Sequence, residues 1–438
     1  MSIWLVPIIN AGLSLWLTIH TLRAKRLIGV FWALATYFGL LLLRDMWVAP
    51  IYYGKASGQG LVDAVVDANH ISQIALSVLL CNLSFLIGQQ ITFRLVARPG
   101  PTLPDMDPTS TAAKFYFYFY LVLFVVGSVV YLPGALTSSY YENVNNLITP
   151  WPSLIFQLST PVLTIAALQR RYIICLVGAV AGVSVVVATH VRELVLLAVL
   201  PTILVLLFRR SGTRKAVVVP FAVLFVGLGT YVEYIRSDVI ELPDEFLPRG
   251  MYLISKQVDG GISGTGNTSL EITAKALVFP FYNRLLIPDY NMPADSATYT
   301  AKIMVAQPAV ESGFQHYPFL WYTDVYLAAG RLGFWQGLVW GGIFGLWEGA
   351  MAGRVIVSAV YLPCFARSLY LFYRGAGAHV FHIVSRQLYF HLVVLLLGGL
   401  YLHRAFQRRK RTHTVRRAPL PSVLSGKYVY KGVRPSRE

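Results

Sequence analysis

Eleven apolar stretches of 15 to 23 residues recur along the chain, and they constrain its fold more than any other feature. A helix of about 20 apolar residues crosses the hydrocarbon core of a bilayer, and a membrane segment must satisfy its own backbone hydrogen bonds. Charged residues make up only 13% of the chain, against about 25% in soluble domains. The sequence therefore predicts an all-α fold, a polytopic transmembrane helical bundle. The predicted spans are Ile3–Ile19, Leu27–Leu43, Ile71–Phe93, Phe115–Leu132, Trp151–Leu168, Tyr172–Thr189, Leu194–Phe208, Ala216–Tyr234, Leu332–Ala352, Val355–Phe372 and Ile383–Leu402.

These spans divide the chain into four parts. Residues 1–234 form a bundle of about eight spans, and residues 332–402 form the C-terminal transmembrane helices. Between them lies a long connection, residues 235–331, which we expect to form a folded extracytoplasmic cap because aromatic residues are spread among its polar groups. Residues 403–438 are basic and poor in apolar residues, which favours a disordered cytoplasmic tail on anionic headgroups. A twelfth span within Glu271–Ile287 is the alternative, although the segment contains Lys, Arg and Pro.

Lysine and arginine sort the connections into two sides. The loops after the first, third, fifth, seventh and ninth spans, together with the tail, carry 24 of these residues, whereas the other short loops carry 4. Because cytoplasmic loops are enriched in Lys and Arg, we expect the N-terminus to lie outside and the C-terminus inside. The same topology explains the net charge of +17, so nucleic acid is not an expected partner.

The ninth span contains a glycine ladder. Gly333, Gly337, Gly341, Gly345, Gly349 and Gly353 recur at every fourth residue. Four residues advance a helix by slightly more than one turn, so these glycines form a smooth, slowly winding groove. The ladder predicts a neighbouring helix at close backbone approach.

Basic residues near the predicted outer surface are candidates for binding a diphosphate. Arg192 lies in the very short hairpin Thr189–Glu193 between two apolar spans, and its guanidinium fork matches phosphate oxygens. Arg236 follows the eighth span as a second candidate, and Arg249 lies further along as a third. The alternatives are that Arg192 pairs with its neighbour Glu193 and that Arg236 is an interfacial anchor.

An aromatic and polar segment precedes the glycine ladder, and we call residues 315–324 the lip. His316 is a candidate general base, because an imidazole accepts a proton near neutral pH. Tyr317, Trp321 and Tyr322 offer apolar faces on which a sugar ring stacks, and Asp324 offers a carboxylate to sugar hydroxyls. The alternative places the aromatic residues in an interfacial belt.

The sequence carries no known metal or cofactor motif. The three cysteines fall inside apolar spans without a CxxC pair, and His379 and His382 lack a third ligand nearby. We therefore expect neither a metal site nor a cofactor.

The order of these features resembles the bacterial O-antigen polymerases and the related O-antigen ligases. The resemblance is carried by Arg192 in the short outer hairpin, Arg236 after the next span, the long outer loop, and the run from His316 to Asp324 that continues into the glycine-rich span. It departs from the family before the first arginine, where this chain has His190 and Val191 in place of small polar residues.

The resemblance implies an inner-membrane glycosyltransferase with a periplasmic active site and no metal. Its substrate would be an oligosaccharide linked to undecaprenyl pyrophosphate, with membrane lipids as surroundings and a flippase and a chain-length regulator as candidate partners. Arg192, Arg236 and Arg249 would bind the pyrophosphate, and His316 and Asp324 would be catalytic. We expect a repeat-unit polymerase. The alternatives are an O-antigen ligase, which transfers the finished glycan to lipid A core, and a transporter of lipid-linked sugars.

Overall fold

The computed structural model describes residues 5–37, 39–40, 43, 68–98, 103–137, 151–189, 199–209, 321, 334–375 and 377–416. The predicted span at 216–234 and all of the 235–331 connection except Trp321 lie outside these ranges. Residues 1–393 form one compact unit and residues 394–438 a second.

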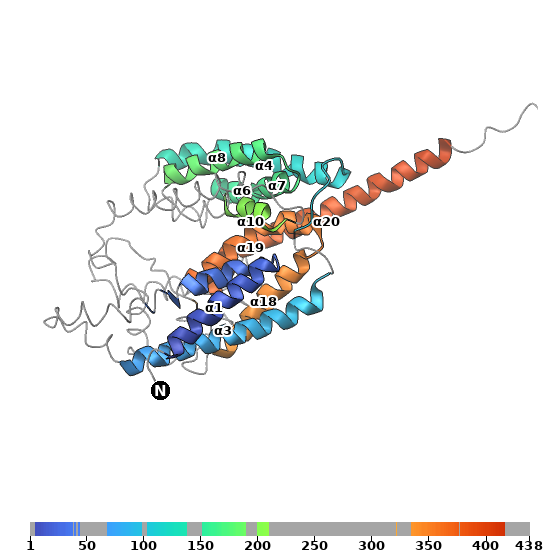
Figure 1. The fold of residues 1–438 in the computed structure, drawn as a ribbon. Helices are drawn as coiled ribbons and strands as arrows, with labels where there is room; N and C mark the ends of the chain where they lie inside the picture. The colour runs from blue at the N-terminus through green and yellow to red at the C-terminus, as the bar shows by residue number, and fades with distance from the viewer. Residues whose placement is uncertain are drawn as a thin grey trace, which may run out of the picture. The chain divides into compact units, whose positions relative to one another are not determined.

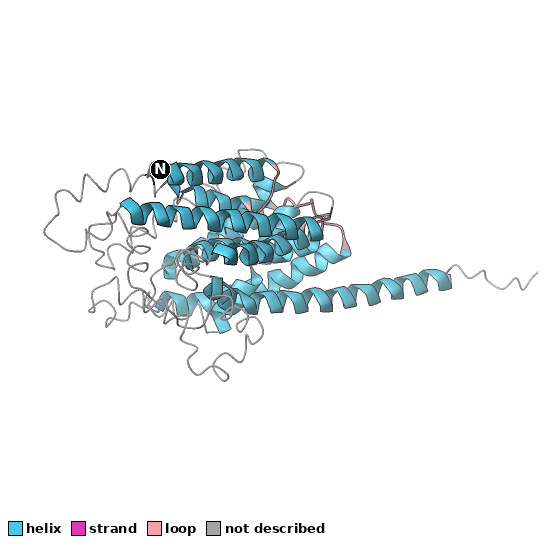
Figure 2. Cartoon of the chain, turned by 90° about the horizontal axis from the view of Figure 1, so that it is seen from below, coloured by secondary structure: helices cyan, strands magenta, loops and turns pink. Residues whose placement is uncertain are grey.

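The described elements are helices, and no strand occurs among the described residues (Figure 2). Residues 29–37 are also helical. The labelled helices (Figure 1) are α1 (Leu5–Arg23), α3 (Ala68–Val96), α4 (Thr111–Thr137), α6 (Trp151–Ser159), α7 (Pro161–Leu168), α8 (Tyr172–Thr189), α10 (Leu200–Phe208), α18 (Gln336–Met351), α19 (Val355–Gly375) and α20 (Gly377–Arg416).

Five helical segments in the described part of the chain are long and apolar enough to cross a membrane: Leu5–Arg23, Leu76–Val96, Thr111–Gly134, Val355–Phe372 and Val384–Arg404. Each overlaps one of the predicted spans. Large apolar side chains stay exposed on these helices, such as Val122 and Val129 on α4, as expected of surfaces that face lipid. The fold is therefore that of a helical membrane protein, while the total of eleven spans stays a prediction.

The glycine ladder is confirmed as a close packing surface at Gly337, Gly341 and Gly345, whereas Gly333 lies outside the described residues and Gly353 follows the end of α18. Helix α18 packs along α3, and the glycines of α18 meet the α3 backbone. A Cβ atom on Gly337 would lie 2.6 Å from the carbonyl oxygen of Cys81, and one on Gly341 would collide with the carbonyl of Phe85. A Cβ atom on Gly345 would lie 2.5 Å from the carbonyl oxygen of Gln89. Only glycine permits this approach of two helix backbones.

The helical hydrogen bonding of the predicted span Trp151–Leu168 is interrupted at Thr160, although the backbone of Thr160 stays in the right-handed helical region, with φ −56° and ψ −23°. Helix α6 ends at Ser159 and α7 begins at Pro161. Pro161 has no N–H to donate to the carbonyl of Gln157, so the α-helical ladder cannot continue through it. The hydroxyl of Thr160 donates to that carbonyl instead, at 2.9 Å. The break is thus built into the sequence, although the apolar run around it reads as one span.

Helix α20 continues past the predicted end of the last span. We expected a disordered tail from His403, but residues 403–416 are helical, and for these residues the expectation was wrong. Arg, Lys and Gln are good helix formers, and extending an existing helix avoids the cost of nucleation. The side chains of Gln407 and His403, one turn apart, also lie 2.8 Å from each other.

Connections that the charge distribution assigned to one side meet at one end of the bundle. The Nζ atom of Lys25 donates to the carbonyl of Arg209 at 3.1 Å, and Leu103 forms a β-bridge with Arg209. The backbone N–H of Met106 donates to the carbonyl of Leu168 at 3.4 Å. We call this end, formed by residues 24–28, 103–106, 168–171 and 209, the basic end. The contacts between these loops agree with the predicted alternation of successive loops between the two sides of the membrane, and the cytoplasmic location of the basic end remains a prediction.

Candidate functional site

Most of the predicted site residues lie outside the residues that the structure describes. These are the candidate catalytic residues His316 and Asp324, the candidate pyrophosphate ligands Arg192, Arg236 and Arg249, and the candidate sugar-binding residues Tyr317 and Tyr322. Trp321 is the lip residue that the structure places.

Trp321 is buried inside the helix bundle. Its side chain is 0% exposed, and its ring centroid lies 5.2 Å from that of Phe372 on α19 in a stacked arrangement. The rings of Phe85 on α3 and Phe31 lie 5.8 Å and 6.1 Å away. The expectation that Trp321 offers an open face to a sugar does not agree with this position, because protein rings surround the indole.

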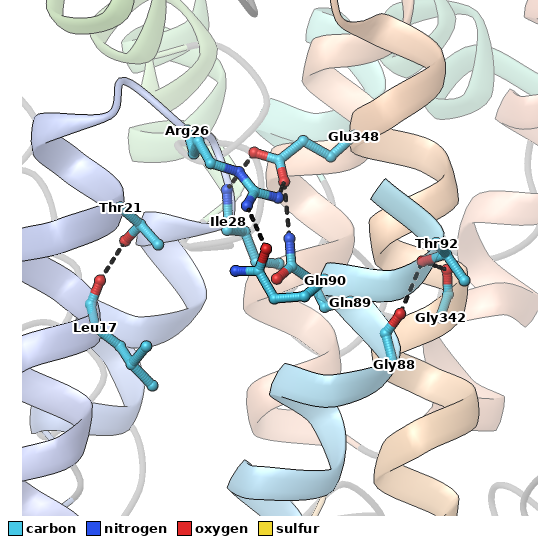
Figure 3. A network of polar contacts seen from close by, with 10 residues as sticks. All are labelled: Leu17, Thr21, Arg26, Ile28, Gly88, Gln89, Gln90, Thr92, Gly342 and Glu348. Carbon is cyan, nitrogen blue, oxygen red and sulfur yellow. Dashed lines mark hydrogen bonds and ion pairs between the residues drawn. The ribbon is translucent and has the colours of Figure 1, made fainter. Parts of the chain in front are cut away.

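A buried carboxylate lies close to this aromatic cluster. Figure 3 shows Glu348 of α18, which is 0% exposed, between the turn that follows α1 and the side chains of α3. Its carboxylate accepts from the Nη2 atom of Arg26 at 2.7 Å, from the backbone N–H of Ile28 at 3.1 Å and from Nε2 of Gln89 at 3.2 Å. Three donors thus compensate for the removal of this charge from water.

The turn after α1 positions Arg26 for this contact. Lys25 adopts a φ of 52°, and the N–H of Arg26 donates to the carbonyl of Thr21 at 2.9 Å, which closes the end of the helix. The guanidinium then spans two helices, since its Nη1 atom donates to Gln90 of α3 at 3.2 Å while Nη2 reaches Glu348 of α18. Arg26 therefore ties the basic end to the glycine-packed pair α3–α18.

The polar contacts of Glu348 lie about one helical turn from the aromatic rings near Trp321. We call these rings, Phe31, Phe85, Phe344 and Phe372, the aromatic seat. Each polar position lies three or four residues, about one helical turn, from an aromatic residue of the seat. The pairs are Ile28 with Phe31, Gln89 with Phe85, and Glu348 with Phe344. Phe31 and Phe85 stack at 4.0 Å between centroids, and Phe85 lies 6.1 Å from Phe344. The ion pair of Arg26 and Glu348 thus lies next to the aromatic rings that pack near Trp321.

A second polar network lies between α6, α19 and α20. Arg367 is 0% exposed, and its Nη1 atom donates to Oε1 of Gln157 at 2.6 Å. Gln387 donates to the same oxygen at 2.8 Å and accepts from the thiol of Cys364 at 3.3 Å. A guanidinium inside a transmembrane helix is costly and marks a functional position by default. Gln157 lies one turn before the break between α6 and α7, so this polar network contacts the helix close to the point where it is interrupted.

His391 extends this polar region along α20, four residues after Gln387. Its Nδ1 atom lies 2.9 Å from the hydroxyl of Tyr120 on α4, and both side chains are fully buried. Its Nε2 atom has no hydrogen-bond partner among the described residues. The pair connects α4 to α20 inside the bundle.

Sequence reasoning missed Glu348, Gln157, Gln387 and His391. A signal existed for Glu348, which is the one acidic residue in the sequence from 332 to 372. An ionisable residue in an apolar span is a functional or structural marker by itself. Among the described residues, no group of three or more His, Cys, Asp or Glu side chains could hold a metal ion.

No protein-family profile, no characterised protein and no solved structure matches this chain.

Proposed function

We propose that this protein is a membrane glycosyltransferase that joins oligosaccharide repeat units linked to undecaprenyl pyrophosphate into O-antigen or a related surface polysaccharide. The reaction takes place on the periplasmic face of the bacterial inner membrane. The N-terminus then lies in the periplasm and the C-terminus in the cytoplasm.

The observation that carries this proposal is the burial of Trp321 inside the helix bundle. Trp321 comes from the run His316–Asp324, on which the resemblance to the polymerases is closest, and it is buried among Phe31, Phe85 and Phe372. Group transfer requires reacting groups at a constant position, and Trp321 is a fixed point close in the sequence to the candidate base His316 and the candidate carboxylate Asp324.

The proposed chemistry is a displacement at the anomeric carbon. A sugar hydroxyl on one lipid-linked unit attacks the anomeric carbon of another chain and forms the new glycosidic bond. The bond between that carbon and the diphosphate oxygen breaks, and undecaprenyl pyrophosphate leaves as an anion. His316 takes the hydroxyl proton, and Arg192, Arg236 and Arg249 stabilise the charge that develops on the diphosphate.

The basic end supports a reaction that uses one face of the membrane. Glu348 binds Arg26, and the buried guanidinium of Arg209 lies 3.4 Å from Asp105 and donates to the hydroxyl of Tyr172 at 3.0 Å. These contacts hold neighbouring segments together at the basic end, and a reaction confined to the opposite face does not require them to separate.

The test uses purified protein in nanodiscs with a polyprenyl-diphosphate-linked repeat unit. We expect glycan products longer than one unit. We expect Arg192→Ala to lower the rate by about 10²–10³-fold and His316→Ala by about 10²–10⁴-fold. Arg94→Ala is the matched control, because Arg94 is exposed at the end of α3. Wild-type rates in the Arg192 and His316 variants would contradict the proposed site.

The ligase alternative is separated by the polysaccharide of a deletion strain. Loss of a polymerase leaves a single repeat unit on the lipid A core, whereas loss of a ligase leaves none. We expect the single unit.

Transport of a lipid-linked sugar is the second candidate, and the network around Arg367 favours it. An ionisable residue inside the membrane next to an interrupted helix is typical of transporter binding sites. Movement of a lipid-linked sugar across proteoliposomes without any new glycosidic bond would support transport over polymerisation.

A further inference from the structure

Polar side chains bridge the seam between two pairs of helices, α4 with α6 and α19 with α20. Gln157 of α6 accepts hydrogen bonds from Arg367 of α19 at 2.6 Å and from Gln387 of α20 at 2.8 Å. The hydroxyl of Tyr120 on α4 lies 2.9 Å from Nδ1 of His391 on α20. Hydrogen bonds between side chain ends depend on precise geometry, so a small rotation of one pair is enough to break them.

Within the first pair, α4 and α6 are in backbone contact. A Cβ atom on Gly127 of α4 would lie 2.8 Å from the backbone nitrogen of Phe156 on α6. Phe124 and Tyr131, about one turn to either side of Gly127, place their rings 5.7 Å and 5.9 Å from the ring of Phe156. Packing this close allows little relative movement, so we expect α4 and α6 to move together.

Helix α7, which follows α6, is held from several directions. All of its residues are buried, and it packs against α4, α8, α10 and α19. A Cβ atom on Gly178 of α8 would collide with the side chain of Leu163, and the thiol of Cys175 lies 3.7 Å from the carbonyl oxygen of Leu163. Helix α7 is therefore the fixed base on which α6 is mounted.

The joint between α6 and α7 can bend without losing hydrogen bonds. Pro161 cannot donate to the carbonyl of Gln157, and the hydroxyl of Thr160 donates there instead. The hydroxyl of Ser159 donates to the carbonyl of Phe156 at 2.6 Å. Bonds of this kind from serine and threonine accompany helix bends. Both lie on the α6 side of Pro161, so a change of angle at the proline leaves them intact.

We propose that α4 and α6 open as one unit away from α19 and α20, with the joint at Pro161 as the hinge and Gln157 as the latch. Opening breaks the two bonds of Gln157 and uncovers Arg367, Gln387 and the neighbouring thiol of Cys364. These three side chains are buried in the closed structure, so the movement controls access to a polar cluster inside the bundle. The inference goes beyond the proposed function, and its test needs no substrate.

The three cysteines of the chain report on three different interfaces. The thiol of Cys364 donates to Gln387 at 3.3 Å beside the latch, Cys175 lies against α7, and the backbone of Cys81 meets Gly337 of α18. All three are free and buried, so a thiol reagent reaches them only when the surrounding helices separate. The full-length protein in nanodiscs is treated with N-ethylmaleimide, and mass spectrometry of the three peptides gives three rates of alkylation from one sample.

Gln157→Ala removes the latch and keeps the hinge. We expect alkylation of Cys364 to rise by about 10-fold to 100-fold, because the acceptor of two hydrogen bonds is lost and one of the donors is charged. Cys175 and Cys81 should stay within about threefold of the wild type, since their interfaces do not open. Gln157→Glu keeps an acceptor and adds a negative charge opposite Arg367, so we expect it to slow the alkylation of Cys364 below the wild-type rate.

Pro161→Ala tests the hinge. It restores an N–H at the joint, and the backbone of Thr160 is already helical, so the helix can become continuous and stiffer. We expect slower alkylation of Cys364 than in the wild type. Gln169→Ala is the matched control, because Gln169 is a buried glutamine at the end of α7, and it should leave the rate at Cys364 unchanged. A melting curve checks that each variant folds.

Three results overturn the inference. A rate at Cys364 that is the same in Gln157→Ala as in Gln169→Ala excludes the latch. Equal acceleration of all three cysteines in Gln157→Ala shows general unfolding in place of a local opening. Alkylation of Cys364 in Pro161→Ala that is as fast as in the wild type excludes the hinge. Selective acceleration at Cys364 in a protein that forms no glycosidic bond leaves the opening established and contradicts the proposed function alone.

Discussion

Two groups of helices in residues 1–393 are held together by different means. Helices α3 and α18 pack backbone against backbone along a row of glycines, with the ion pair of Arg26 and Glu348 at one end. Helices α4, α6, α19 and α20 are connected by buried polar side chains, which include Arg367, Gln157 and the pair Tyr120–His391. Helix packing in the first group depends on glycines, which have no side chain, and helix packing in the second group depends on hydrogen bonds between side chains.

This difference indicates that α3 and α18 form the more rigid of the two groups, and we call this pair the frame. Backbone contacts along a helix leave no freedom to slide, because every carbonyl that meets a glycine is itself fixed. Hydrogen bonds between neutral side chains, such as the one from Gln387 to Gln157, can exchange partners at little cost, since membrane-buried ones contribute about 0.6 kcal/mol on average. The frame of α3 and α18 carries Phe85 and Phe344 of the aromatic cluster near Trp321, whereas the polar group contains the interrupted helix. The following substitutions test this distinction.

The largest effect is expected from removal of the buried carboxylate. Glu348→Ala leaves the guanidinium of Arg26 without its anion in a site of low polarity. We expect a loss of about 3–5 kcal/mol in the free energy of unfolding. Unfolding in detergent, followed by circular dichroism, measures it.

A double substitution separates charge from packing at this position. In Arg26→Leu with Glu348→Leu both charges are absent, and we expect most of the stability to return, because an apolar pair of similar volume leaves no charge buried alone. If the double variant is as unstable as Glu348→Ala, the ion pair is not what holds the end of α3 and α18 together.

A smaller effect is expected from a single methyl group in the glycine groove. The Cβ atom of Gly341→Ala would meet the backbone of Phe85, so the two helices must separate, at a cost of about 1–3 kcal/mol. Gly12→Ala on α1 is the matched control, because a Cβ atom there meets nothing within 4 Å. We expect it to be neutral or stabilising by up to about 1 kcal/mol, through the higher helix propensity of alanine. Equal melting temperatures in the two variants would argue against close packing of α3 and α18.

The sequence predicted the frame better than the polar group, for a physical reason. The length of an apolar span and the spacing of glycines are local properties, so the spans around Val355–Phe372 and the packing surface of Gly337, Gly341 and Gly345 could be predicted. The partners of buried charges are not local. Glu348 is 322 residues from Arg26, and Gln157 is 210 residues from Arg367, so no sequence pattern joins them.

Three further differences arise from competition between local signals and tertiary context. The apolar residues of Trp151–Leu168 concealed the effect of Pro161, which ends one helix and starts another. The charged residues after Leu402 resembled a disordered tail, yet they extend a helix that already exists. Trp321 stands among polar residues in the sequence, but its burial is decided by Phe31, Phe85 and Phe372, which come from three distant segments.

The smallest effect is expected in the polar group, where one hydrogen bond is removed. Tyr120→Phe deletes the hydroxyl that lies 2.9 Å from Nδ1 of His391 and keeps the ring. We expect a loss of about 0.6–1.7 kcal/mol, from the average to the largest value found for hydrogen bonds between membrane helices. Tyr118→Phe is the control, because Tyr118 lies on the same helix and is 56% exposed. A loss from Tyr120→Phe well above about 1.7 kcal/mol, beyond the largest value found for such hydrogen bonds, would mean that the polar group is as fixed as the glycine-packed pair, and the distinction between frame and adaptable group would no longer hold.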